Sequence, residues 1–227
     1  MSAPAAERWW VFVTVLTVVL LLYSTLGLPP AWYVPVNLLA TAGLLLVARR
    51  VGMTAPDLAV EPSRFRSGLR WGLVAGLGIA GVLVVGAAIP ATRPLFDDAR
   101  TAGIGPALLA YRALVRIPLG TALLEEVAFR GVLFGAWQRV AAVRTAAAAS
   151  SLVFGLWHVR PVLDLLAEND VAANGPERIL AVIAAVLGTT IAGIAFCWLR
   201  MRSRSLVAPF VAHTVVNSLA TLAAYVV

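Results

Sequence analysis

Long apolar stretches separated by short polar segments dominate the pattern of this 227-residue chain. A helix that crosses the hydrocarbon core of a bilayer needs about 20 mostly apolar residues, and seven segments approach this length. The first follows a single arginine, Arg8, and has no clear small-residue cleavage site after it, so we interpret it as a helix and not as a signal peptide. The predicted spans are 9–28, 32–48, 69–90, 107–135, 144–160, 179–200 and 205–226.

The composition supports this interpretation. Hydrophobic residues make up 61% of the chain and charged residues 13%, with a mean hydropathy of +0.90, whereas soluble domains are about half apolar and a quarter charged. A single cysteine, Cys197, excludes an internal disulfide. The sequence contains no CxxC pattern of the kind that would indicate a structural zinc site. We therefore predict an all-α polytopic membrane helix bundle that forms one membrane domain over residues 1–227.

The arginines predict an orientation. All 18 basic residues are arginines, and in a seven-span bundle eleven of them fall on the side of the N-terminus and four on the other side. Loop arginines are enriched on the cytoplasmic side, so we expect an integral protein of a bacterial cell membrane with a cytoplasmic N-terminus. The arginines form no basic face, which argues against a nucleic-acid partner. The eleven are Arg8, Arg49, Arg50, Arg64, Arg66, Arg70, Arg139, Arg144, Arg200, Arg202 and Arg204, and the four are Arg93, Arg100, Arg160 and Arg178.

Two spans carry further signals. In the fourth, Arg112 and Arg116 precede Pro118. If this segment were two elements, the number of spans would be eight and the C-terminus would lie on the other side of the membrane.

In the third span, glycines recur every four residues, at Gly68, Gly72 and Gly76. Such spacing lets helix backbones approach closely in lipid, so we expect this span to pack tightly against a neighbour.

Six polar residues lie inside apolar segments: Glu125, Glu126, Arg130, His158, His213 and Asn217. Ionisable groups within a membrane usually face a cavity or a partner. Residues four apart on a helix share a face, so Glu126 can pair with Arg130, and His213 lies on the same face as Asn217. Glu125 is rotated by about 100° from Glu126, so one glutamate can be held by the arginine while the other faces the interior, where a carboxylate would suit a general base. The alternative is structural: the Glu–Arg pair could join two helices, and the histidines and Asn217 could bond between helices.

The same residues match three motifs in order. EEVAFR (125–130) fits EExxxR, FGLWH (154–158) fits FxxxH, and HTVVN (213–217) fits HxxxN. The chain therefore resembles the CAAX-protease and bacteriocin-processing family of intramembrane endopeptidases, over a core of about 107–220. The resemblance implies that Glu125 activates a water together with His158, that Arg130 holds Glu126, and that His213 and Asn217 stabilise the oxyanion. It also implies a packing role for Phe129 and Phe154.

The resemblance predicts an intramembrane endopeptidase that hydrolyses a peptide bond near the membrane surface. The family has often been described as metalloproteases, and Glu125, His158 and His213 resemble a His₂Glu zinc set. The HExxH spacing is absent, however, so we expect a reaction that requires no cofactor, with zinc on these three residues as the alternative.

The expected partners are the lipid bilayer and a peptide or protein substrate, either a prenylated protein or a peptide precursor. Two other functions fit the same polar cluster. One is a non-catalytic immunity or scaffolding membrane protein of the same family. The other is a small transporter, although no inverted repeat supports it.

Overall fold

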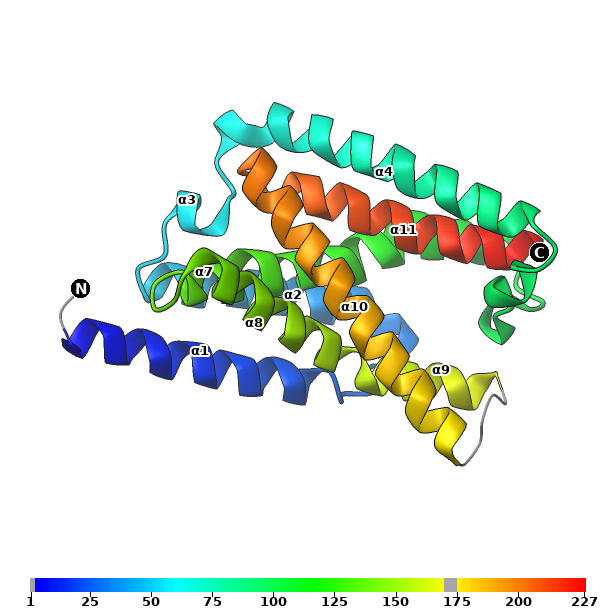
Figure 1. Ribbon diagram of the computed structural model, residues 1–227, viewed down its shortest axis with the longest axis horizontal. Helices are drawn as coiled ribbons and strands as arrows, with labels where there is room; N and C mark the ends of the chain where they lie inside the picture. Colours follow the sequence, from blue (N-terminus) through cyan, green and yellow to red (C-terminus); the bar gives the residue numbers. More distant parts are fainter. Residues whose placement is uncertain (1–2, 170–174) are drawn as a thin grey trace.

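The computed structural model describes residues 3–169 and 175–227 as a bundle of helices (Figure 1). Among these residues there is no β-strand, and seven helical stretches are long and apolar enough to cross a membrane. The predicted all-α polytopic bundle is thus confirmed. The spans are α1 (Ala3–Tyr23), α2 (Pro30–Arg50), α4 (Phe65–Ala88), a composite helix over 106–137, α8 (Val143–Trp157) continued by α9 (Val159–Glu168), α10 (Pro176–Ser203) and α11 (Val207–Val226). Short elements between spans are α3 (Ala55–Leu58), η1 (Pro62–Arg64), η2 (Arg93–Phe96) and η3 (Ala99–Thr101).

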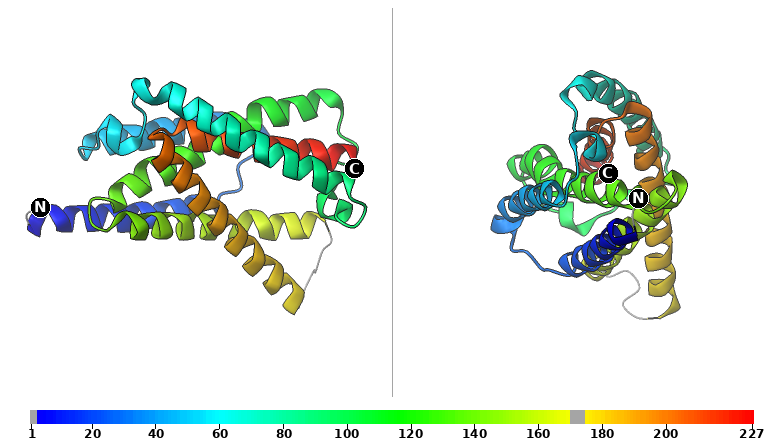
Figure 2. Two further views of the ribbon diagram at one scale, coloured as in Figure 1. Left: turned by 45° about the horizontal axis from the view of Figure 1, so that its top comes forward. Right: turned by 90° about the vertical axis from the view of Figure 1, so that its left-hand side faces the viewer.

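The composite helix lies in the middle of the bundle. Figure 2 shows α4 and α11 on one side of it and α1 on another, while α10 crosses the bundle obliquely. The N-terminus and the ends of α2, α7 and α10 gather at one end of the molecule, and the C-terminus lies at the other (Figure 1). The segments that carry the eleven arginines therefore share one end. That this end is cytoplasmic stays a prediction from arginine distribution.

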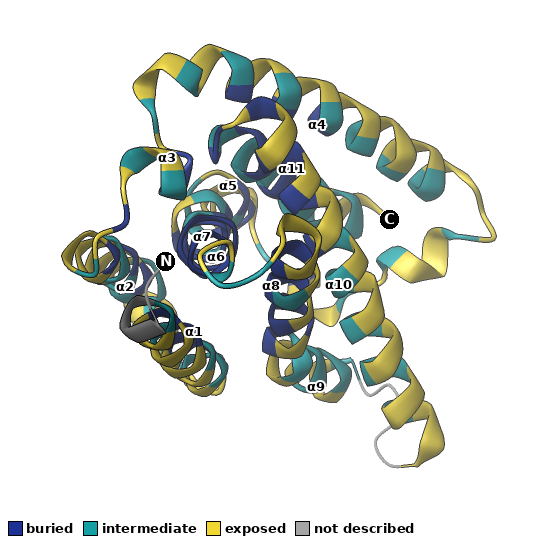
Figure 3. Ribbon diagram, turned by 60° about the vertical axis from the view of Figure 1, so that its left-hand side comes forward, coloured by how far each residue is buried: buried dark blue, intermediate teal, exposed yellow. Residues whose placement is uncertain are grey.

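The composite helix is continuous through Pro118. It consists of α5 (Pro106–Tyr111), η4 (Arg112–Ala122), α6 (Leu123–Glu125), η5 (Glu126–Leu133) and α7 (Phe134–Trp137), of which η4 and η5 are wider, π-helical stretches. Every residue of η5 is buried, as the dark central helix of Figure 3 shows. The alternative of two elements and eight spans is therefore wrong, because the fourth span runs as one helix.

Side chains from two neighbouring helices stabilise the wide turns around Pro118. A proline has no N–H to donate, and in a π-helix the carbonyl that loses its donor lies five residues earlier. Ser218 of α11 donates from Oγ to this carbonyl, that of Ala113, at 2.8 Å. From α2, Asn37 Nδ2 donates to the Gly120 carbonyl at 2.6 Å. The altered helix thus keeps its polar groups bonded inside the bilayer.

The predicted glycine face packs α4 against α11. Gly68, Gly72 and Gly76 are the buried residues of α4. A Cβ atom placed on Gly72 would lie 2.8 Å from Val211 Cβ and 3.0 Å from the Ala208 carbonyl oxygen. The absence of side chains on this face therefore lets the two helices approach closely, as the spacing predicted.

Arg200 was predicted to lie in a loop, but the structure places it inside a helix. Helix α10 continues to Ser203, and Arg200 lies buried inside it. Its Nη2 donates to the Asp57 carbonyl and its Nη1 to Gln138 Oε1 at 3.3 Å, while the guanidinium lies over the Phe134 ring at 4.4 Å. Arg200 thus ties α10 to α3 and to the end of α7, a contact that a count of loop charges misses.

We expect Gly72→Leu to lower the stability of the protein because the added side chain collides with α11. Overpacking of this kind costs about 1–3 kcal/mol. The midpoint of thermal unfolding in detergent measures the effect. Gly81→Leu is the matched control, since no atom lies within 4 Å of a Cβ placed there. Equal midpoints for the two variants would contradict the packing role.

Candidate active site

The composite helix carries three charged residues in the middle of the bundle. Glu125 ends α6, and Glu126 and Arg130 lie in the π-helical stretch η5 that follows. All three are buried, with Arg130 fully inaccessible to solvent. A buried charge is costly unless it is paired and hydrogen-bonded, so the partners of each group decide how the cluster is tolerated.

Glu126 and Arg130 form the expected pair. Arg130 Nη1 donates to Glu126 Oε1 at 3.1 Å. The Arg130 guanidinium also lies 3.8 Å from the centre of the Phe154 ring and 5.0 Å from that of Phe196. Aromatic faces attract a cation most strongly when both are desolvated. The guanidinium is therefore stabilised by one carboxylate and by rings from α8 and α10.

Glu126 also holds His213. Its Oε1 lies 2.7 Å from His213 Nδ1, and the imidazole stacks on the Phe196 ring at 5.1 Å. Because an ionised carboxylate oxygen only accepts hydrogen bonds, we assign Nδ1 as the donor. The other ring nitrogen, Nε2, then faces Glu125 Oε2 at 3.7 Å.

His158 approaches the same carboxylate oxygen from the end of α8. Its Nδ1 lies 2.7 Å from the Phe154 carbonyl oxygen. A carbonyl only accepts, so Nδ1 carries the hydrogen and Nε2 has a free lone pair. This Nε2 lies 4.0 Å from Glu125 Oε2. The His158 side chain is 21% exposed, against 4% for His213, so the cluster is most accessible on the His158 side.

Glu125 thus has two different carboxylate oxygens. Oε1 accepts a hydrogen bond from Trp157 Nε1 at 3.2 Å. Oε2 is buried and has no hydrogen-bond partner among the described residues, although two imidazole nitrogens face it. Glu125 Oε2 and His158 Nε2 both present lone pairs to the same small space. Two acceptors so placed require a hydrogen-bond donor between them. A water molecule meets this requirement.

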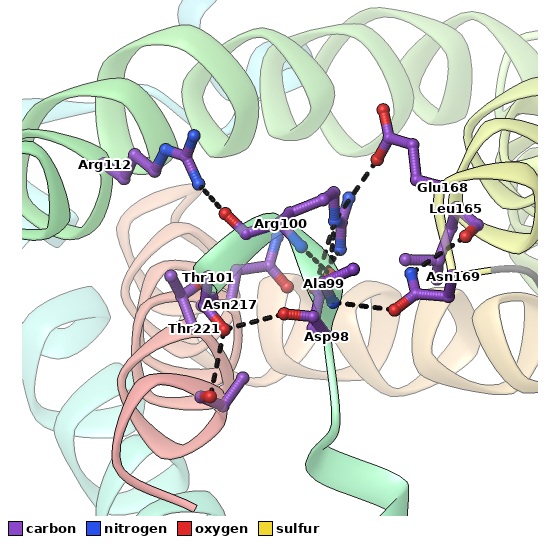
Figure 4. Close-up of polar contacts among 11 residues, drawn as sticks. Asp98, Ala99, Arg100, Thr101, Arg112, Leu165, Glu168, Asn169, Asn217 and Thr221 are labelled. Atoms are coloured by element: carbon purple, nitrogen blue, oxygen red, sulfur yellow. Dashed lines mark hydrogen bonds and ion pairs between the residues drawn. The ribbon is translucent and has the colours of Figure 1, made fainter. Parts of the chain in front are cut away.

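Asn217 is the one predicted site residue for which no side-chain contact with this cluster is found among the described residues. It lies one turn beyond His213 on α11, and its backbone carbonyl accepts from Thr221 Oγ1 at 2.9 Å. Figure 4 shows it near the loop that contains Asp98 and Arg100. In that loop, hydrogen bonds from Arg100 lower the pKa of Asp98 below its usual range.

Several residues around the cluster were missed by the sequence reasoning. Trp157 bonds Glu125, and Phe196 stacks on His213. Asn37 is buried in α2 and bonds the turn before Glu125. Asn37 could have been found, because it is a polar residue in an apolar span. Nothing in the local sequence distinguishes Trp157 or Phe196 from other aromatic residues.

Glu125, His158 and His213 are the residues that a zinc ion would require. Two ligands at about 2.0–2.1 Å from a tetrahedral zinc ion lie about 3.3 Å apart, whereas Glu125 Oε2 is 3.7 Å and 4.0 Å from the two imidazole nitrogens. Among the residues that the structure describes, no group of three or more His, Cys, Asp or Glu side chains is arranged to hold a metal ion. The arrangement therefore does not fit a tetrahedral zinc ion.

The family model described as type II CAAX prenyl endopeptidase Rce1-like matches residues 107–219. The chain belongs to this Rce1-like family. The resemblance inferred from the three motifs is thereby confirmed, and the matched segment contains all six predicted site residues. No curated protein and no solved structure matches the chain.

Membership in the Rce1-like family supports a CAAX-type intramembrane protease that acts on a peptide or protein substrate in the membrane. Together with the seven apolar helices, it establishes an integral membrane protein. The helices α1, α2 and α4 lie outside the matched segment.

We expect Arg130→Met to destabilise the protein strongly. The change leaves Glu126 buried beside His213 without its cation, and breaking a buried pair costs about 3–5 kcal/mol. Thermal unfolding in detergent measures the loss. Arg160→Met is the matched control, since Arg160 forms an i,i+4 pair with Asp164 in which both side chains are about half exposed, and such pairs contribute about 0–1 kcal/mol. A similar small loss in both variants would contradict the stabilising role of the buried pair.

Proposed function

We propose that this protein is an intramembrane endopeptidase in which Glu125 activates a water molecule for attack on a peptide bond. The observation that carries the proposal is the buried and unpartnered Oε2 of Glu125, which two imidazole nitrogens face. Family membership supports the reaction class. The roles of individual residues rest on their contacts and on the motifs.

The water would lie between Glu125 Oε2 and His158 Nε2. These two atoms are 4.0 Å apart, and both accept hydrogen bonds, so the water can donate one hydrogen to each and keep a lone pair for the substrate carbonyl carbon. As the O–C bond forms, Glu125 takes the proton. It then passes this proton to the leaving nitrogen as the C–N bond breaks. The second hydrogen of the water stays on the new carboxyl group, so the products are a carboxylic acid and an amine.

The negative charge that develops on the substrate carbonyl oxygen requires donors in a dry site. His213 can supply one through Nε2 when both ring nitrogens carry hydrogen, with Nδ1 held on Glu126 Oε1. Asn217 would supply the second from one turn further along α11. Its support is its position in the motif and on the helix face, not a side-chain contact.

Glu126 and Arg130 hold this geometry and do not react. Glu126 Oε1 is shared by Arg130 and His213, whereas the unpartnered Oε2 of Glu125 is the oxygen that the Nε2 atoms of His158 and His213 face. The substrate is a membrane-bound peptide or protein whose scissile bond can reach the His158 side. A prenylated protein and a peptide precursor both meet this description.

We expect Glu125→Gln to lower cleavage at least about 100-fold while the protein still folds and inserts, because general-base catalysis contributes about 10²–10⁴-fold. His158→Ala should cause a comparable loss. Comparative peptidomics of membranes that contain the wild type or the variant first identifies cleaved peptides, and the purified proteins in liposomes then give rates. Glu168→Gln, a change of an exposed carboxylate, is the matched control. Cleavage retained by Glu125→Gln would refute the proposal, and a purified wild type that cleaves none of the identified peptides would favour a non-catalytic role.

We further propose that the reaction needs no metal, and we expect cleavage to continue after exhaustive chelation. The purified protein is treated with a strong chelator, its zinc content is measured by mass spectrometry, and its rate is compared with that of untreated protein. Loss of activity on chelation followed by recovery with zinc would show instead that Glu125, His158 and His213 bind a metal.

A further inference from the structure

The two oxygens of the Glu125 carboxylate are distinguished by a single hydrogen bond. Trp157 Nε1 donates to Oε1, and Oε2 is left to face the histidines. An indole N–H is only a donor and has no acceptor lone pair to offer. It can therefore orient the carboxylate but cannot compete for the proton that the base removes.

Two aromatic rings pack against the indole. Its ring stacks on Tyr23 of α1, with centroids 5.9 Å apart and planes 10° apart. The Phe129 ring packs against it in a T-shaped arrangement, with ring centroids 5.4 Å apart. Trp157 is 7% exposed. A ring restrained in this way keeps its N–H aimed at one position.

Two hydrogen bonds link Tyr23, the stacking partner of the indole, to the turn that precedes Glu125. Tyr23 donates from its hydroxyl to Asn37 Oδ1 at 2.6 Å, and Asn37 Nδ2 donates to the Gly120 carbonyl at 2.6 Å. The stacking partner of Trp157 and the backbone that carries Glu125 are thus tied to the same amide. Both Tyr23 and Asn37 lie outside the segment that the family model matches.

The surroundings of the indole are apolar. A cavity of about 320 Å³ between α1 and α2 is bordered by Leu16, Leu20, Leu44, Leu124, Tyr23 and Trp157. Trp157 and Leu124 therefore separate Glu125 from an apolar space. A hydrogen bond in such surroundings is stronger than one exposed to water, and Glu125 itself is only 6% exposed.

We propose that Trp157 is a positioning residue for the reaction: its N–H fixes the Glu125 carboxylate so that Oε2 alone serves as the base, and α1 and α2 hold the indole through Tyr23 and Asn37. This inference rests on the proposed function of Glu125. It assigns the two N-terminal spans a part in catalysis, in addition to their part in the bundle.

The test removes the N–H and keeps the ring. Trp157 is replaced by its sulfur isostere, β-(3-benzothienyl)alanine, which preserves shape and stacking, and in a second variant by phenylalanine. Without the donor the carboxylate can rotate, and misplacement of a catalytic group by about 1 Å costs up to about 100-fold. We expect kcat to fall about 10- to 100-fold in both variants, with KM changed less than about 3-fold, because the bond orients the base and does not bind substrate.

Trp32→Phe is the matched control, since Trp32 is a largely exposed tryptophan of α2 at 62%, and it should keep the wild-type kcat. Thermal unfolding of each variant shows whether it is folded. The isostere keeps the test valid even if the phenylalanine variant does not fold.

Wild-type kcat in the isostere variant would overturn the positioning role, as would a rise in KM with kcat unchanged. Glu125→Gln is measured in the same assay. If Glu125→Gln retains cleavage, the proposed function itself fails. If Glu125→Gln is inactive while the isostere variant is fully active, the function stands and only the role of Trp157 is refuted.

Discussion

One carboxylate oxygen, Oε1 of Glu126, organises the centre of this protein. It accepts from the Arg130 guanidinium at 3.1 Å and bonds His213 at 2.7 Å, so it connects the composite helix to α11. Each of these three groups would be costly to bury without the others. Because Glu126 Oε1 holds His213 through Nδ1, the other ring nitrogen of this histidine faces Oε2 of the neighbouring Glu125. The chemistry proposed for Glu125 therefore depends on a structural ion pair one residue away.

The helix that carries these groups is itself unusual. Two π-helical stretches, η4 and η5, lie on either side of Glu125. Wide turns of this kind occur often at functional sites, and here Pro118 falls inside the first. The polar groups around the proline are bonded by Ser218 and Asn37 from neighbouring helices. The bundle thus supports a backbone distortion that an isolated membrane helix could not sustain.

Some of the site followed from spacing alone. Glu126 and Arg130 are four residues apart, and the pair formed as that spacing predicts. The approach of His158 and His213 to one carboxylate oxygen could only be expected from the motifs, because it requires three helices to meet. Trp157 shows most clearly what the sequence could not predict about the site. Its side chain would suit lipid contact or core packing equally well, and only the position of Glu125 on another helix makes its N–H a partner for the carboxylate.

By itself the sequence determined the class of fold, the seven spans, the close packing of the α4 glycines and the presence, inside one span, of charged residues that are costly to bury. These depend on local properties: the length of apolar runs, the period of the helix and the cost of burying a charge in lipid. The tertiary structure decided which glutamate oxygen faces the two histidines, that Arg200 is buried against α3, and that α1 and α2 reach the site through Tyr23 and Asn37. Those features arise from contacts between residues far apart in the chain, and such contacts exist only once the helices have packed.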